Sequence, residues 1–314
     1  MPRLGSGRAR GSRAPPERGR SGGGGPRPFS AIVGAAPGTG RHLPPSVGHG
    51  VRVGALAALR ICNLGSGSSG NATFVATDEA RVLFDAGFSC RQIQLRLAAI
   101  GVDYKTLDAV VISHEHSDHV QGLETLIRKT AVKVFVSQPT SEKLTWKRAV
   151  PELTTFEAGR GFEIGDLAIE TFTVSHDAVD PVGFCIGHGG CKLSIATDLG
   201  YLSDSVRYHL LGSDLIVLES NHDLEMLKSG PYPWDLKQRV MSRAGHLSNA
   251  AVAEFLSQHW DRRARTVVLA HLSTNNNHPT IAEMDACRAI GSVQADNTRV
   301  VVASQGSPTP VFEL

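Results

Sequence analysis

A stretch of six residues, HEHSDH, holds three histidines and two acids directly after the apolar run 110–112. Ionisable side chains this close repel one another and are costly to bury, so something is expected to bind them. His114, His116 and Asp118 lie two residues apart, so an extended or loop backbone points them the same way. His119 begins the helix expected to follow. Imidazole and carboxylate groups are ligands for zinc, manganese or iron, so the stretch predicts metal binding.

Further ligands are expected downstream, because six residues cannot complete the coordination of the two neighbouring ions that such a stretch could serve. Three residues fit: His176 ends TFTVSH, Asp198 ends LSIATD and His271 ends TVVLAH. Each closes an apolar strand and opens a loop, which is where rigid scaffolds place reacting groups. The sequence therefore predicts seven metal ligands, which are His114, His116, Asp118, His119, His176, Asp198 and His271.

The elements that position these residues can be outlined from the apolar patterns. Strands lead from 59–63 onward, and helices are expected at about 89–100, 141–149 and 248–260. The runs GFCIG and CKLSIAT are expected to be two strands joined by a tight GHGG hairpin turn. No linker interrupts residues 59–314, so one α/β domain is predicted, with two sheets packed between helices.

The composition is typical of a soluble globular protein, with 41% hydrophobic and 20% charged residues in a chain of 314. No run of about 18 apolar residues exists, so no membrane-spanning helix is expected. The five cysteines are scattered and form no CxxC pair, which indicates neither a disulfide framework nor a cysteine zinc cluster. A cytoplasmic location is therefore predicted.

Residues 1–57 differ from the rest of the chain. They hold nine arginines, no lysine and one acid, Glu17, which is a net charge of +8. Subtracting them from the 32 basic and 30 acidic residues leaves 23 and 29, a net of −6 for residues 58–314. Such a Gly/Pro-rich segment has too few apolar residues to fold, so a disordered extension is predicted before a domain at 58–314. A misplaced start, a targeting leader and a nucleic-acid-binding arm remain open interpretations.

The order of these motifs resembles that of the metallo-β-lactamase fold hydrolases, and more closely the YycJ/WalJ-type DNA exonucleases of that superfamily. The likeness extends over about residues 60–314. Eight stretches carry it: NLGSGSSGN at 63–71, SHEHSDH at 113–119, SHDAVDPVGF at 175–184, ATDLGY at 196–201, ESNHD at 219–223, GPYPW at 230–234, GHLSN at 245–249 and HLSTNNNHP at 271–279.

The resemblance implies an αββα sandwich with a dinuclear metal site and hydrolysis of DNA phosphodiesters from a 5′ end. On this basis we expect two manganese or zinc ions that share a hydroxide as the nucleophile. We assign His114, His116 and His176 to the first ion, with Asp198 as the bridge. The second ion is expected to bind Asp118, His119 and His271. Asp118 is also expected to orient the hydroxide.

Contacts to the substrate are expected from two further motifs. His246 in GHLSN is the candidate proton donor to the leaving sugar oxygen. Ser248 is a candidate substrate contact and also a candidate cap for the helix at 248–260. Asn221 and His222 in ESNHD are candidate substrate contacts, with a purely structural role as the alternative.

Two other functions fit the same residues. A small-molecule hydrolase acting on a lactone, thioester or cyclic phosphodiester would use the same fold and ligands, and the acidic balance of residues 58–314 favours it. A binding module with a vestigial metal site is the second, although every ligand position is intact. For DNA, a local groove of basic side chains is expected from Arg91, Arg96, Lys105, Lys143, Lys147 and Arg148.

Deleting residues 1–57 is expected to leave folding and metal binding unchanged, because that stretch cannot bury a core. Thermal unfolding and metal content of the truncated and full-length proteins check this. A clear loss of thermal stability would contradict it. A loss of DNA affinity alone, smaller at high salt, would favour the basic-arm interpretation.

Overall fold

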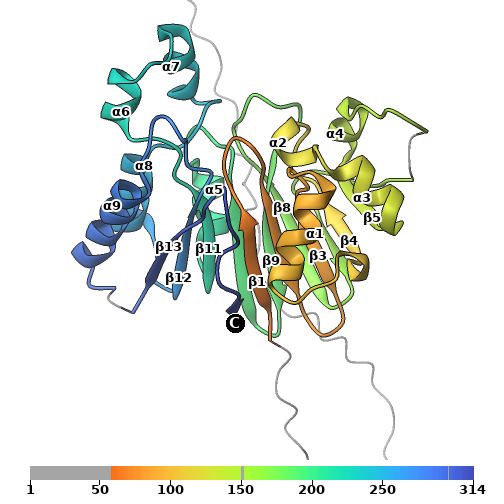
Figure 1. Ribbon diagram of the computed structural model, residues 1–314. Coiled ribbons are helices and arrows are strands. Elements are labelled where there is room, and N and C mark those ends of the chain that lie inside the picture. The colour runs from red at the N-terminus through yellow and green to blue at the C-terminus, as the bar shows by residue number, and fades with distance from the viewer. Residues whose placement is uncertain (1–57, 150–151, 296) are drawn as a thin grey trace, which may run out of the picture. The chain divides into compact units, whose positions relative to one another are not determined.

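The computed structural model describes residues 58–149, 152–295 and 297–314, all of which belong to one compact unit. The predictions for residues 1–57 lie outside the described residues. Within them, two seven-stranded sheets lie between layers of helices, as Figure 1 shows. The predicted single-domain α/β fold, an αββα sandwich, is thus confirmed.

The first sheet is built mainly from the first half of the domain. The strands β3, β4, β5 and β6 run parallel, while β14, β1 and β2 add antiparallel pairs. In spatial order the strands are β14 (Phe312–Glu313), β1 (Arg60–Gly65), β2 (Ala72–Ala76), β3 (Arg81–Phe84), β4 (Ala109–Val111), β5 (Lys133–Ser137) and β6 (Thr154–Phe156).

The second sheet repeats this plan with the second half. Its strands β10, β11, β12 and β13 run parallel, while β7, β8 and β9 form an antiparallel meander that leads into β10. In spatial order the strands are β13 (Arg299–Val302), β12 (Thr266–Ala270), β11 (Leu215–Glu219), β10 (Cys191–Ala196), β9 (Val182–His188), β8 (Leu167–Thr173) and β7 (Gly161–Ile164).

Helices cover the outer faces of both sheets. The side chains of α1 (Cys90–Ala99) and α3 (Leu123–Thr130) pack on the first sheet, and those of α5 (Asp204–Leu210), α8 (Asn249–Glu254) and α9 (Pro279–Ser292) on the second. A π-helical turn, Phe255–His259, extends α8, so the helix expected at 248–260 is confirmed. The remaining helices are α2 (Ser117–Val120), α4 (Gln138–Lys143), α6 (Leu224–Ser229) and α7 (Trp234–Val240), with a 3₁₀ turn at Tyr104–Thr106.

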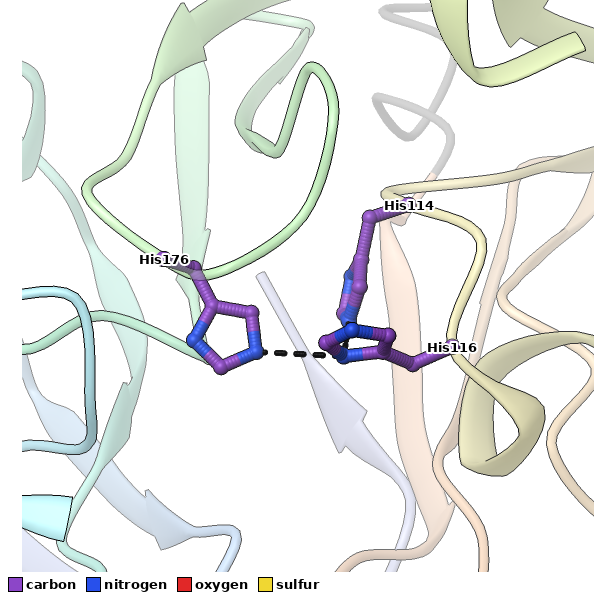
Figure 2. Close-up of side chains that lie close together, drawn as sticks. All are labelled: His114, His116 and His176. Carbon is purple, nitrogen blue, oxygen red and sulfur yellow. Dashed lines mark hydrogen bonds between the residues drawn. The ribbon is translucent and has the colours of Figure 1, made fainter. Parts of the chain in front are cut away.

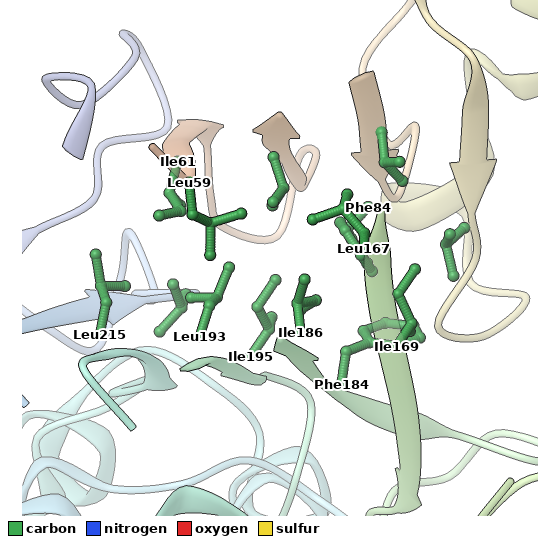
Figure 3. Packing of buried hydrophobic residues seen from close by; sticks show 14 of the residues in the cluster. Leu59, Ile61, Phe84, Leu167, Ile169, Phe184, Ile186, Leu193, Ile195 and Leu215 are labelled. Atoms are coloured by element: carbon green, nitrogen blue, oxygen red, sulfur yellow. The ribbon is translucent and has the colours of Figure 1, made fainter. Parts of the chain in front are cut away.

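The central core forms where the two sheets meet. Along β3, Val82 and Phe84 point into this core while Leu83 points to the helical layer outside, which is the two-residue period of a strand buried on both faces. Phe84 meets Phe184 of the other sheet edge to face, with ring centroids 5.0 Å apart. Figure 3 shows the apolar side chains of the two sheets meeting in this layer.

Two local predictions of turn and helix have different outcomes. The GHGG turn joins β9 and β10 as expected, with Gly189 and Gly190 at φ of 58° and 86°. The helix expected at 141–149 is wrong in its bounds: α4 begins at Gln138, because the Ser137 hydroxyl accepts a hydrogen bond from the Thr140 amide, and it ends at Lys143.

The expected basic groove loses one member. The guanidinium of Arg96 donates to the carbonyls of Leu64 and Gln305 and lies over the Phe88 ring, 4.0 Å from its centroid. Arg96 therefore joins segments of the fold.

Among the described residues, no helix combines the length and the apolar character that crossing a membrane requires.

Gly87 fixes the approach of the loop after β3 to the HEHSDH stretch. A Cβ atom at this position would lie 1.6 Å from the carbonyl oxygen of Asp118 and 2.6 Å from the amide nitrogen of Asn71. Real Cβ atoms do not come so close to backbone, so only glycine fits. The neighbouring Ala86 amide donates to the His119 carbonyl at 2.7 Å, which ties the same two loops together.

We predict that Gly87→Ala lowers the free energy of unfolding by about 2 kcal/mol or more, because the backbone at Asp118 must move. Gly291→Ala is the control, since no heavy atom lies within 4 Å of a Cβ there and the residue is helical. The control is expected to be neutral or more stable by up to about 1 kcal/mol. Denaturant unfolding measures both; equal effects would contradict the prediction.

Candidate metal centre

The site residues gather at one edge of the sandwich because of strand direction. The strands β3 and β4 are parallel, as are β10, β11 and β12, and β8 shares their direction because two antiparallel pairings separate it from β10. Parallel strands end at the same edge of a sheet, so residues that follow them are neighbours. Three of these residues, Asp85, Asp198 and His271, have left-handed backbones with φ of 62°, 59° and 55°. Such strained conformations are typical of functional sites.

Three histidines form the first group of donor atoms. Nε2 of His114 lies 3.1 Å from Nδ1 of His116, and Nε2 of His176 lies 3.2 Å from that same atom. Figure 2 shows the three rings converging from two different loops. The structure therefore brings together three predicted ligands that are separated by up to 62 positions in the chain.

The second group comprises Asp118, His119, Asp198 and His271. Nε2 of His119 lies 3.2 Å from Oδ2 of Asp198, and Nε2 of His271 lies 3.5 Å from Oδ1 of Asp198. Oδ2 of Asp118 is 3.4 Å from Nε2 of His271. Asp198 also reaches the first group, because its Oδ1 lies 3.9 Å from Nε2 of His176. All seven predicted ligands are thus brought together, with Asp198 between the groups.

The outward-facing nitrogen of several rings is anchored by an oxygen. His119 donates from Nδ1 to Asp85 at 2.8 Å, and His271 donates from Nδ1 to Glu219 at 2.9 Å. His176 donates from Nδ1 to the Gly245 carbonyl at 3.2 Å. A neutral imidazole that donates from one nitrogen carries a lone pair on the other. In all three rings this leaves Nε2 free to bind a cation, which is the arrangement found around protein metal ions.

Binding of a divalent cation satisfies the donor atoms better than hydrogen bonds among these side chains can. One proton on Nδ1 of His116 can serve only one of its two nitrogen neighbours, whereas a cation binds all three lone pairs. Oδ2 of Asp198 is buried and has no hydrogen-bond partner among the described residues, although Nε2 of His119 lies 3.2 Å away. Histidine and carboxylate donors together suit zinc or manganese.

The protonation of the centre reflects its charges. Burial disfavours the charged form of His271, but the carboxylates of Asp198, Asp118 and Glu219 overcome this and raise the pKa of its ring to about 10. The pKa of His119 is likewise well above its usual value, because Asp198 and Asp85 outweigh its burial. Without cations, protonated histidines balance the buried acids. Cations that bind here displace those protons.

The first group behaves differently. Burial, together with the neighbouring His119, holds the pKa of His114 well below its usual value. Burial also lowers the pKa of His176. These rings are therefore neutral near pH 7, which is the form that binds metal ions.

Sequence reasoning missed two residues that hold the predicted ligands in place. Asp85 accepts hydrogen bonds from His119 and also from the amide and hydroxyl of Ser113, whose Oγ lies 3.0 Å from Nδ1 of His114. Glu219 is fully buried and accepts from both His271 and His246. Both acids stand at strand ends, after β3 and at the end of β11. The strand-end criterion that selected Asp198 applies to them as well.

His246 lies beside the centre. Its Nδ1 donates to Oε1 of Glu219 at 2.7 Å and lies 4.0 Å from Oδ1 of Asp198. The charge of Glu219 outweighs the burial of the ring, so the pKa of His246 is raised. The His246 ring centroid is 5.1 Å from the centroids of both His176 and His271.

The other three candidate substrate contacts, Asn221, His222 and Ser248, are hydrogen-bonded or buried within the fold. Asn221 donates to the His271 carbonyl at 2.8 Å, and the Ser248 hydroxyl accepts from the Ala251 amide, so the predicted helix cap is confirmed. His222 is buried and pairs with Ser248 in an isolated β-bridge, and in the part of the chain that the structure describes its Nδ1 has no hydrogen-bond partner. Burial lowers its pKa to about 4. Their contact with substrate stays a prediction.

Comparison with known proteins agrees with this geometry. Residues 80–272 match the beta-lactamase superfamily domain. The chain belongs to this superfamily. It is 35% identical over 230 residues to the exodeoxyribonuclease YycJ of Bacillus anthracis, and the matched region covers 72% of this chain and 87% of that protein. It is 36% identical over 261 residues to the exodeoxyribonuclease WalJ of Streptococcus pneumoniae, and the matched region covers 80% of this chain and 96% of that protein.

A solved structure of the superfamily shares the fold. The metallo-beta-lactamase fold protein YhfI of Bacillus subtilis superposes with a TM-score of 0.64 at 18% identity, over 82% of this chain and all of that one. Together with the donor groups, these relationships make this member of the beta-lactamase superfamily a metal-dependent hydrolase of the YycJ/WalJ group.

We predict that Asp85→Asn weakens divalent-metal binding by about 10- to 100-fold, because the amide keeps only one acceptor oxygen for His119 and Ser113 and loses the negative charge. Competition with a chelator measures the affinity without any substrate. Asp108→Asn is the control, since Asp108 also accepts a backbone amide hydrogen bond, from Arg81, but at an exposed position outside both donor groups. Equal metal affinity in both variants would count against a role for Asp85.

Proposed function

We propose that this hydrolase removes nucleotides from the 5′ end of DNA with the help of two divalent cations. The observation that carries the proposal is the two neighbouring donor groups at one edge of the sandwich, with Asp198 in the second group and 3.9 Å from His176 of the first. The names of the relatives support DNA as the substrate, since both are exodeoxyribonucleases. The absence of a long apolar helix among the described residues is compatible with the predicted cytoplasmic location.

The two groups suggest how the cations are held. His114, His116 and His176 would hold one cation, and Asp118, His119 and His271 the other, with Asp198 between them. The first group offers only nitrogen, which favours zinc, while the carboxylates of the second also suit manganese. When bound, such a pair supplies a more acidic water and neutralises the charge of the phosphate oxygens.

The protein's own side chains would position water and move a proton. Asp118 is the most open acid of the centre, and its Oδ2 accepts a hydrogen bond from Asn71 at 3.3 Å, which fixes it toward the donor groups. We assign it the orientation of the attacking water. His246 is turned by Glu219 so that Nε2 remains available, and we assign it the donation of a proton to the leaving sugar oxygen.

Contacts to the rest of the substrate are assigned to Asn221, His222 and Ser248, all beside His246 or His271. Among these three, His222 has an unused polar atom, because its buried Nδ1 has no hydrogen-bond partner within the described residues. Neutral His222 would accept or donate a single hydrogen bond to a nucleotide without adding charge.

We predict that the protein with manganese or zinc shortens a 5′-phosphorylated DNA duplex from its 5′ ends. His246→Ala is expected to slow turnover by about 100- to 10,000-fold while the metal content stays unchanged, because only the proton donor is lost. The assay follows a duplex labelled at both ends over time, beside single-stranded DNA, RNA, a lactone panel and a cyclic phosphodiester.

His259→Ala provides the matched control, since His259 lies in the π-helical turn after α8, outside the donor groups. Its rate is expected to equal that of the unmodified protein. Inert DNA beside a rapidly cleaved lactone or cyclic phosphodiester would refute the nuclease proposal and favour a small-molecule hydrolase.

A further inference from the structure

We propose that Trp234 is a platform on which an unpaired base of the substrate stacks next to the metal centre. The proposal depends on the proposed function, because it requires a nucleic-acid substrate. Trp234 opens α7 and its side chain is 60% exposed, the largest value among the exposed large apolar residues of the described chain. Figure 1 shows α6 and α7 standing beyond the edge of the sandwich, at the end where α2 with Asp118 and His119 also lies.

The segment that carries Trp234 is fixed to the loop after the metal-ligand candidate His271. The Tyr232 hydroxyl accepts a hydrogen bond from the side-chain amide of Asn275 at 3.1 Å. A Cβ atom at Gly230 would lie 2.7 Å from Oδ1 of Asn276, so glycine lets the two segments touch. The position of the indole is therefore tied to the loop that follows His271.

The far end of α7 is fixed to two other loops of the centre. Arg239 donates from Nε to Oδ2 of Asp177 at 2.8 Å, and the other oxygen of Asp177 lies 3.3 Å from Nε2 of His176. The Val240 carbonyl accepts the amide of His246 at 2.9 Å. Three loops that carry site residues thus hold α7 and the segment before it, so the position of this helix relative to those loops is fixed.

The surface around this helix is suited to bases more than to phosphates. Pro231 and Pro233 restrict the backbone before Trp234, which lowers the entropy lost when a ligand stacks on the indole. Val179, in the loop after His176, is 43% exposed and its amide donates to Glu115 of the HEHSDH stretch, so the loops of the centre expose a second apolar side chain. A single exposed tryptophan needs no explanation by itself; its rigid mounting beside a catalytic centre supports a binding role.

The charge of the domain points to the same conclusion. Residues 58–314 carry a net charge of −6, so attraction to phosphates contributes little overall. Stacking holds nucleic acid without relying on charge or on base identity, because every base has an aromatic face. Locally, the exposed Arg243 lies over the Tyr201 ring, 4.0 Å from its centroid, and adds one cation near the loop after Asp198.

The test compares binding of three nucleic-acid ligands, two single-stranded and one double-stranded, to the full-length, metal-loaded protein by fluorescence anisotropy. The first is an oligonucleotide of about ten residues with hydrolysis-resistant phosphorothioate links. The second has the same backbone without bases, and the third is the duplex. Trp234→Ala is expected to weaken binding of the first on the order of tenfold, and Trp234→Phe to restore most of it. Binding of the abasic strand is expected to be unchanged.

Tyr208→Ala is the control, because Tyr208 on α5 is also an exposed aromatic residue, at 49%, in a helix that packs on the outer face of the second sheet. Equal binding by Trp234→Ala and the unmodified protein, or an equal loss on the abasic strand, would overturn the proposal. Because no bond is cleaved, this result is independent of the nuclease assay. Unchanged shortening of DNA together with unchanged binding by Trp234→Ala would reject the platform and leave the proposed function intact.

Discussion

The buried carboxylate of Asp198 is the interaction on which the site depends. It is 2% exposed, and histidines that follow strands of both sheets surround it: His119 from α2, and His176 and His271 from loops of the second sheet. Opposing charges hold its pKa well below the usual value despite the burial that would raise it. An isolated buried charge costs several kcal/mol, so Asp198 requires cationic partners in every state of the protein.

This requirement explains the layer behind the ligands. Asp85 joins β3 to His119 directly and to His114 through Ser113, and Glu219 joins β11 to His271 and His246. Each sheet thus supplies one buried acid that fixes the rings facing the other sheet. The strained backbones at Asp85, Asp198 and His271 persist because the central core holds the strands in place on either side.

Much of this could be predicted from the sequence, because the ligands are local features: a dense motif and three polar residues that close apolar strands. Asp85 and Glu219 were missed although they stand at strand ends, because their roles depend on which strands pair, which no local pattern reveals. Arg96 was misassigned to a DNA groove because its partners, Leu64 and Gln305, are distant in sequence. The bounds of α4 were missed because the capping Ser137 belongs to the preceding strand.

The most direct test of the account is the metal content of Asp198 variants after reconstitution and removal of free ions. The unmodified protein is expected to hold two equivalents, and Asp198→Ala is expected to lose both, because the residue lies between the donor groups. Asp198→Asn, which keeps the shape, distinguishes loss of charge from loss of fold, and Asp204→Ala at a fully exposed position serves as the control. A folded Asp198→Ala protein that retains two equivalents would contradict the shared-carboxylate account.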